Sequence, residues 1–220
     1  MKKISVLLIV AAAILTMGSC GNKTPQVPFD NGDSADLANA DPTIYGISGE
    51  ATTMNTLQLI TDTGDTLSFD LSYANENEQV FGGLQTGDRM AVIPNANKKE
   101  AMKVINQTTL LGNWVMPNPL DGSDEVGIRI KEGGIAEGIE QTTLSYRTWR
   151  LTHGMLEIVL VQEDGSGEEE VNLYEIVKLG ADSLVYKNTE DLYEYTRQQP
   201  KKGYGTEIKL EDASMEDYKI

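Results

Sequence analysis

Two features of this sequence could carry catalysis or bind a metal: its single histidine, His153, and a dense acidic run at residues 163–170. A histidine can serve as the base of a Ser-His-Asp triad or as a zinc ligand. His153 stands in the stretch LTHGM, which is typical of a hairpin turn, and nothing in the sequence places a serine beside it. We therefore expect an exposed turn residue, and a hydrolase ranks last among the functions considered.

The acidic run EDGSGEEE offers carboxylates for glycoside hydrolysis, and its Asp164, Glu168 and Glu169 offer oxygen ligands for weak calcium binding. Charges crowded onto a Gly-Ser turn are, however, typical of a solvated loop tip. The sequence also contains no Walker loop and no G-x-G-x-x-G stretch. We therefore predict that the protein is not an enzyme and has no catalytic residue, metal site or cofactor.

The N-terminus indicates export and lipidation. Two lysines precede the apolar run Ile4–Leu15, which is shorter than the roughly 20 residues that a membrane-spanning helix needs. This pattern is typical of a signal peptide. The next residues, LTMGSC, resemble the lipobox of bacterial lipoproteins, with Met17 where that family usually has leucine or valine. The resemblance implies a signal peptide at residues 1–19 and a lipidated Cys20 that anchors the chain to a membrane.

Residues 20–43 are predicted to be a flexible tether, because they contain few aromatic or branched residues and many Pro, Asn, Asp and Gly. The residues after Cys20, GNKTPQ, are not acidic. Some Bacteroidales lipoproteins look to use an acidic run at this position for export to the cell surface. We therefore expect a protein of the cell envelope, on the periplasmic side of the outer membrane, with surface exposure as the alternative.

The charge of the chain excludes one class of partner. It has 34 acidic and 18 basic residues, a net charge of −16, and loss of a signal peptide with two lysines makes it more negative. Such a surface repels phosphate backbones and anionic headgroups. We therefore expect no nucleic-acid partner, and a protein that stands off the membrane on its lipid anchor.

Residues 44–106 are predicted to form a small β-domain. Leu57 and Leu59 alternate with polar residues, as do Phe69 and Leu71, which is the period-two pattern of strands with one buried face. The stretch TDTGDT between them has the residues of a hairpin turn. Five to six such strands favour a closed or nearly closed barrel, similar to the small OB-type barrels. The stretch KKEAMKVINQTTL is compatible with either a short helix or a closing strand.

Residues 107–198 contain eight short strand candidates, separated by turn signals such as PNPLDGSD, THG and GAD. This spacing is typical of an all-β barrel, and the simplest arrangement is an up-and-down barrel of eight antiparallel strands. The predicted fold class is therefore all-β, with two small barrels in one chain. Residues 199–220 are a polar tail, and the sequence is compatible with either a short extra strand or disorder there.

Three residues of the second domain strengthen its interpretation. Gly112-Asn113-Trp114 resembles the G-x-W at the start of the first lipocalin strand, and Arg197 ends the last predicted strand. The stretch 110–198 resembles the compact lipocalin-like domains of Bacteroidales lipoproteins. The resemblance implies that Arg197 packs over Trp114 and closes the barrel floor, while Gly112 lets the chain cross that floor closely.

Two functions remain open. The first is a barrel that binds a small apolar ligand. Its predicted lining residues are Ile128, Ile130, Trp149, Leu156, Ile158 and Tyr195. The alternative is a filled barrel without a small ligand, in a structural lipoprotein that engages another envelope protein or a glycan, because strands of about six residues leave little interior room.

Overall fold

The computed structural model describes residues 40–122, 124–140, 145–161 and 167–199. The predicted signal peptide, Cys20, Asp164 and nearly all of the predicted tether and tail therefore lie outside the described residues. In the described part of the chain, no helix is long and apolar enough to cross a membrane.

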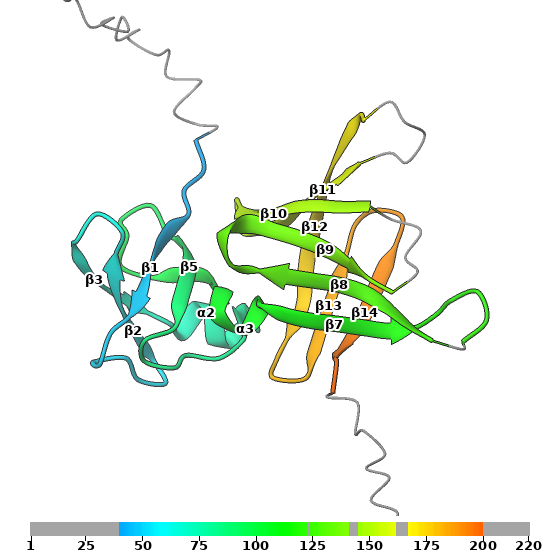
Figure 1. Ribbon diagram of the computed structural model, residues 1–220. Coiled ribbons are helices and arrows are strands. Elements are labelled where there is room, and N and C mark those ends of the chain that lie inside the picture. The colour runs from blue at the N-terminus through cyan, green and yellow to red at the C-terminus, as the bar shows by residue number, and fades with distance from the viewer. Residues whose placement is uncertain (1–39, 123, 141–144, 162–166, 200–220) are drawn as a thin grey trace, which may run out of the picture. The chain divides into compact units, whose positions relative to one another are not determined.

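Residues 44–106 form a mixed six-stranded sheet (Figure 1). Its strands are β1 (Ile44–Ser48), β2 (Thr56–Thr61), β3 (Thr66–Asp70), β4 (Val80–Phe81), β5 (Arg89–Pro94) and β6 (Ala101–Asn106). They are ordered β3-β2-β1-β5-β6-β4, and only β4 and β6 run parallel. A short helix, α2 (Ser72–Glu76), leads from β3 toward β4. The alternation read from the sequence holds, since Leu57, Leu59 and Phe69 are fully buried.

This sheet approaches closure without completing it. β3 and β4 stand at its two edges, and a single bridge between Asp70 and Glu100 joins the end of β3 to the start of β6. The ambiguous stretch contains both alternatives, because β6 is followed at once by the helical turn α3 (Gln107–Leu110). The OB-type likeness of this domain stays a prediction.

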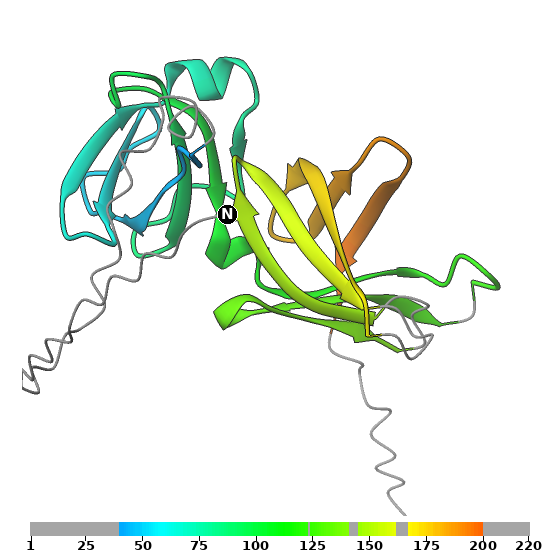
Figure 2. The same cartoon turned by 90° about the horizontal axis from the view of Figure 1, so that it is seen from above.

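Residues 112–197 form a closed barrel of eight strands (Figures 1 and 2). They are β7 (Gly112–Pro117), β8 (Glu125–Lys131), β9 (Ile135–Ile139), β10 (Ser145–Thr152), β11 (Met155–Val161), β12 (Glu169–Leu179), β13 (Ser183–Lys187) and β14 (Leu192–Arg197). Each pairs antiparallel with its neighbour in the chain, and β14 pairs with β7 to close the barrel. The seam between β9 and β10 is thin, with Thr148 and Ile135 as its paired residues. The all-β prediction and the eight-stranded up-and-down barrel are confirmed.

The barrel core continues into the first sheet. Phe81, Ala91 and Ile105 of that sheet, together with Leu110 of α3, belong to the same buried cluster as the barrel interior. The remaining core of the sheet is a separate cluster around Leu57 and Phe69. The described residues from Asp41 onward accordingly belong to one unit, in which side chains of the sheet cover one end of the barrel.

Candidate functional site

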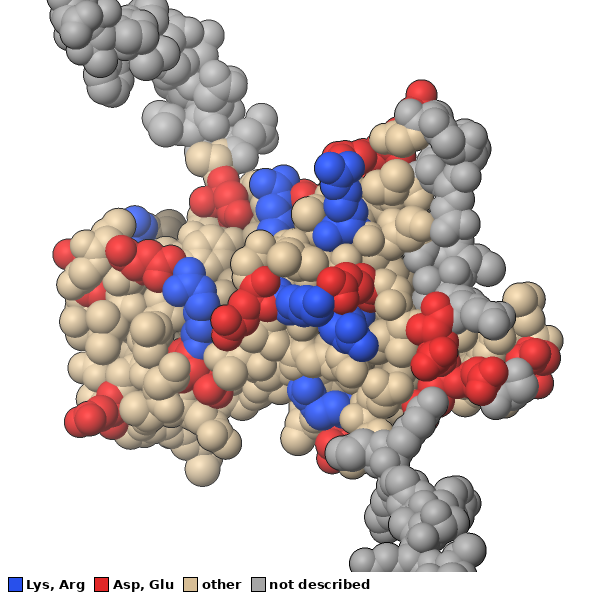
Figure 3. Space-filling view, in the orientation of Figure 1, with Lys and Arg blue, Asp and Glu red and all other residues tan. Residues whose placement is uncertain are grey.

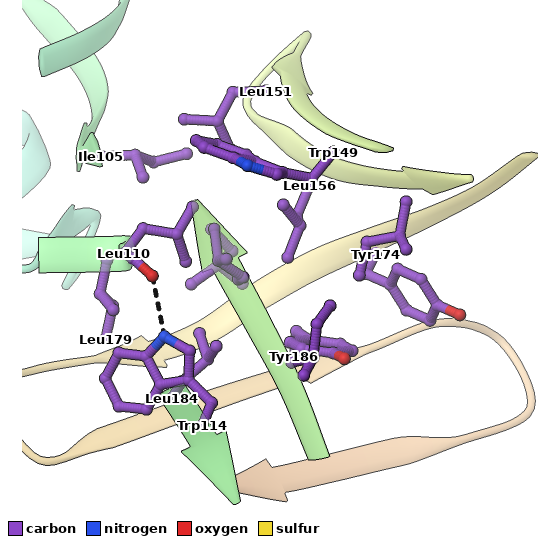
Figure 4. Packing of buried hydrophobic residues seen from close by; sticks show 14 of the residues in the cluster. Ile105, Leu110, Trp114, Trp149, Leu151, Leu156, Tyr174, Leu179, Leu184 and Tyr186 are labelled. Carbon is purple, nitrogen blue, oxygen red and sulfur yellow. Dashed lines mark hydrogen bonds between the residues drawn. The ribbon is translucent and has the colours of Figure 1, made fainter. Parts of the chain in front are cut away.

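The floor of the barrel is built by Trp114 and Arg197. Trp114 is fully buried on β7, and its Nε1 donates a hydrogen bond to the carbonyl oxygen of Leu110 at 2.8 Å (Figure 4). The guanidinium carbon of Arg197 lies 4.1 Å from the centre of the indole ring, a separation at which a cation is attracted to an aromatic face. The two predicted partners therefore meet.

Arg197 is also held by three backbone carbonyls. Its Nε donates to Ala181 at 2.5 Å, its Nη1 to Leu111 at 2.9 Å and its Nη2 to Thr109 at 2.8 Å. A guanidinium presents its donors in a fixed planar fork, so one side chain ties the segment that leads into β7 to the β12–β13 turn. Arg197 is thus a structural clasp.

Gly112 has a different role from the one inferred for it. Its φ is +137°, a backbone conformation that residues with a side chain rarely adopt. A Cβ at this position would collide with Nη1 of Arg197. The glycine therefore leaves room for the guanidinium rather than for a close crossing of the chain.

The six predicted ligand-lining residues all lie in the buried core of the barrel. None of these side chains is more than 8% exposed, and all belong to one cluster. Trp149 additionally donates from its Nε1 to the carbonyl oxygen of Lys131 at 2.8 Å. A ligand among these residues would require the core to open, and only Trp149 also lines the cavity described below.

Much of the remaining barrel interior is occupied by five tyrosines, which we call the tyrosine cluster: Tyr146, Tyr174, Tyr186, Tyr193 and Tyr195. Neighbouring ring centres among the last four lie 4.9 to 6.3 Å apart. The hydroxyl of Tyr186 donates to that of Tyr195 at 3.3 Å. Of these five, only Tyr195 was among the predicted lining residues, because a tyrosine that alternates with polar residues does not reveal which other tyrosines it meets.

Burial raises the pKa of Tyr146, Tyr174, Tyr186 and Tyr195 above the usual value for tyrosine. A raised folded-state pKa contributes stability that is present below the unfolded pKa of about 10 and is lost as the pH rises above it. We expect these four phenols to ionise only as the barrel unfolds in alkali, when phenolate absorbance is followed beside circular dichroism. All nine tyrosines of the chain titrating near pH 10 with the fold intact would contradict this.

The cavity of greatest functional interest lies outside the barrel, where β10 and the turn before β9 face the first sheet. We call it the junction cleft, and its volume is about 660 Å³. The turn is a 3₁₀ segment, η1 (Glu132–Gly134), with Gly133 at φ 75°. The cleft is lined by Asp41, Tyr45, Asp62, Arg89, Gln107, Thr108, Leu111, Glu132, Gly133, Gly134, Trp149, Arg150, Leu151 and Thr152.

The two arginines of the cleft are each paired with a carboxylate. Arg89 donates from Nη1 and Nη2 to the two carboxylate oxygens of Asp62, at 3.0 and 2.6 Å. Arg150 donates in the same two-pronged way to Glu157, at 2.6 and 2.8 Å. These hydrogen bonds raise the pKa of both guanidinium groups. Basic and acidic side chains also lie side by side across the face drawn in Figure 3.

Tyr45 ties the two sides of the cleft together. It lies on β1 of the first sheet, and its hydroxyl donates to the carbonyl oxygen of Leu151 on β10 at 2.7 Å. Burial raises the pKa of this phenol, and the nearby charge of Asp41 adds to the effect. Tyr45 therefore remains a neutral hydrogen-bond donor at physiological pH.

Comparison with known proteins identifies the second half of this arrangement. Residues 106–198 match a family model described as lipocalin-like. These residues form a lipocalin-like domain. The chain is also similar to a lipocalin-like protein from Bacteroides thetaiotaomicron VPI-5482 of known crystal structure, with 31% identity, coverage of 41% of this chain and 97% of that chain, and a TM-score of 0.37. The comparison with curated proteins found no match.

The lipocalin-like domain supplies Trp149 and Arg150 to the cleft, whereas Tyr45, Asp62 and Arg89 come from the first sheet. Sequence reasoning missed all of these except Trp149, whose face was ambiguous. The sequence did indicate an exposed position for Asp62, which stands in the predicted hairpin turn TDTGDT. Nothing local indicated that this turn would face the lipocalin-like domain.

His153 lies in the turn between β10 and β11 of the lipocalin-like domain. Its backbone N–H donates to Oδ1 of Asp41 at 3.0 Å, and its Nδ1 lies 3.1 Å from the Thr152 hydroxyl. Of the acidic run, Glu169 forms an ion pair with Arg147 at 2.6 Å. Among the described residues, no group of three His, Cys, Asp or Glu side chains is placed to hold a metal ion.

Proposed function

We propose that this protein is a lipid-anchored binding protein of the bacterial envelope, and that its ligand occupies the junction cleft. The observation that carries the proposal is the cleft itself. Its volume of about 660 Å³ is in the range of small-molecule sites, which occur preferentially between structural units. Tyr45 and Trp149 supply apolar surface there, and the paired arginines supply directed donors.

The packing of the barrel supports the cleft over the barrel interior. An eight-stranded barrel is just wide enough for side chains to fill it or for one small ligand. Here Trp114, Trp149 and the tyrosine cluster take up that space, and the first sheet covers one end. A ligand in the cleft needs no rearrangement of this core.

The cleft is tested by blocking it. Gln107→Trp places a large side chain in the cleft, and Glu194→Trp, on an exposed position of β14, is the matched control. We expect the wild-type protein and the control to retain a small molecule from an envelope extract in native mass spectrometry, and Gln107→Trp to lose it while keeping the wild-type melting temperature.

Either of two outcomes would contradict the cleft as the binding site. The first is the same retained mass in well-folded Gln107→Trp. The second is the absence of any retained molecule on the wild-type protein.

Anchoring at Cys20 is the second part of the proposal, and it rests on the signal-like N-terminus and the lipobox resemblance. Lipid chains gain about 0.8 kcal/mol for each methylene buried in the bilayer. We therefore expect Cys20→Ser to move the protein from the membrane to the soluble fraction of the producing cells, with its melting temperature unchanged. Retention of Cys20→Ser in washed membranes would show that another feature holds it there.

A structural lipoprotein remains the second candidate, favoured by the outer wall of the barrel. On β12, Val171 is 58% exposed and Leu173 and Val177 are each 46% exposed. Apolar side chains grouped on a surface are typical of protein contacts. A photo-crosslinking residue at Leu173, and not at Glu194, should then capture one defined envelope protein in intact cells. Equal or absent capture from both positions would count against this candidate.

A further inference from the structure

The cleft disfavours anionic ligands and has no uncompensated charge at its two arginine pairs. Both of its arginines are already neutralised by two-pronged carboxylate contacts of 2.6 to 3.0 Å, so an anion on their remaining N–H groups would lie next to the negative charge of Asp62 or Glu157. The remaining carboxylates of the cleft, Asp41 and Glu132, repel anions further, as does a chain with a net charge of −16. A cation would be attracted by Asp41 and Glu132 but repelled by the two guanidinium groups. A neutral ligand meets neither penalty.

The same pairs are well suited to hydroxyl groups. A guanidinium has five N–H donors and a carboxylate accepts about four hydrogen bonds. The Arg89–Asp62 contact uses two of each, so donors and acceptors remain next to one another on groups whose positions are already set. A hydroxyl both donates and accepts, and neighbouring hydroxyls on a sugar ring can therefore bind the two partners of one such pair.

An apolar surface continues from the cleft along the first sheet. The strand register places Ile47 of β1 directly opposite both Ile60 of β2 and Arg89 of β5. Ile47 is two residues after Tyr45 and therefore lies on the same face of β1. Ile47 and Ile60 are each 45% exposed. The Arg89–Asp62 pair thus crosses β1 between Tyr45 in the cleft and the two isoleucines outside it. The apolar surface therefore extends beyond the cleft.

Resting on the proposed function, we propose that the ligand of the junction cleft is a neutral oligosaccharide. One sugar places its C–H face against Tyr45 and its hydroxyls on the Arg89–Asp62 pair, and the next sugar lies over Ile47 and Ile60. The apolar C–H face of the sugar packs on the side chains. Its hydroxyls exchange their hydrogen bonds to water for hydrogen bonds to the Arg89–Asp62 pair.

The test is an array of neutral oligosaccharides of glucose, galactose, mannose and N-acetylglucosamine, with sialylated and uronate-containing ones beside them. We expect the wild-type protein to bind a neutral member. Calorimetry with that member should show binding about tenfold or more weaker for the double variant Arg89→Gln with Asp62→Asn. The matched control is Lys187→Gln with Glu175→Gln, another exposed ion pair, which should bind like the wild type.

Length dependence tests the second sugar position. Affinity should rise from the monosaccharide to the oligosaccharide in the wild type, and Ile47→Ser should remove that rise while leaving the monosaccharide affinity unchanged. Binding of acidic glycans only, or of no glycan, would overturn the proposal. If a non-carbohydrate molecule is retained by the wild type and lost from Gln107→Trp, the cleft is still a binding site and only the sugar assignment fails.

Discussion

Replacing Trp114 with alanine is expected to lower the free energy of unfolding by about 3 to 5 kcal/mol, as the removal of large buried aromatic side chains does. The indole is fully buried, and its removal opens a cavity at the centre of the floor. The carbonyl of Leu110 loses its indole partner, and the guanidinium of Arg197 loses the ring below it.

Chemical denaturation of the wild type and of Trp114→Ala measures this difference directly. Val171→Ala, at an exposed position on β12, is a suitable control, because surface truncations usually change stability by less than about 0.5 kcal/mol. The stability of Trp114→Phe should fall between those of the wild type and Trp114→Ala, because phenylalanine refills part of the cavity but cannot donate a hydrogen bond to Leu110. An unchanged midpoint for Trp114→Ala would contradict the floor role of the indole.

Arg197→Ala is expected to lower the free energy of unfolding by about 2 kcal/mol, less than Trp114→Ala because the side chain is only partly buried. The loss has two causes. Three backbone carbonyls lose a charged donor, and the top of the indole is uncovered. Arg197→Lys should recover only part of the stability, because an ammonium group lacks the planar fork that reaches three carbonyls at once. Full recovery by lysine would mean that charge alone matters.

The two residues should also be coupled. In a double-mutant cycle, Trp114→Ala and Arg197→Ala should together cost about 0.5 to 2 kcal/mol less than the sum of the single changes, since each removes the contact that the other has with it. Trp114→Ala with Val171→Ala provides the additive reference, because those positions lie on different strands and faces. A coupling energy of zero would separate the two halves of the floor.

The local sequence was sufficient to predict the strands. Leu57 and Leu59 on β2, and Ile128 and Ile130 on β8, alternate with polar residues, and all four are buried. Such alternation depends only on neighbouring residues, because successive side chains of a strand point to opposite faces. The G-x-W stretch and the distant Arg197 then indicated how the last strand returns to the first, and β14 does pair with β7.

The same local pattern could not separate core from ligand lining. Ile128 and Leu156 point into the barrel in either case, and whether they meet a ligand or one another depends on how large the opposing side chains are. Tyr174 and Tyr186, contributed by other strands, decide this by filling the interior. Period two reports only the direction of a side chain.

The sequence by itself determined the fold class and the eight strands of the second domain, because these follow from alternation and turns, and its resemblance to lipocalins at G-x-W and Arg197 implied the residues that close the floor. Only the tertiary structure decided that the first sheet covers one end of the barrel and that Tyr45, Arg89 and Trp149 share a cleft. The physical reason is that these three residues belong to separate strands in two sheets. Their approach depends on strand register and on the packing of one sheet against the other, which no short stretch of sequence encodes.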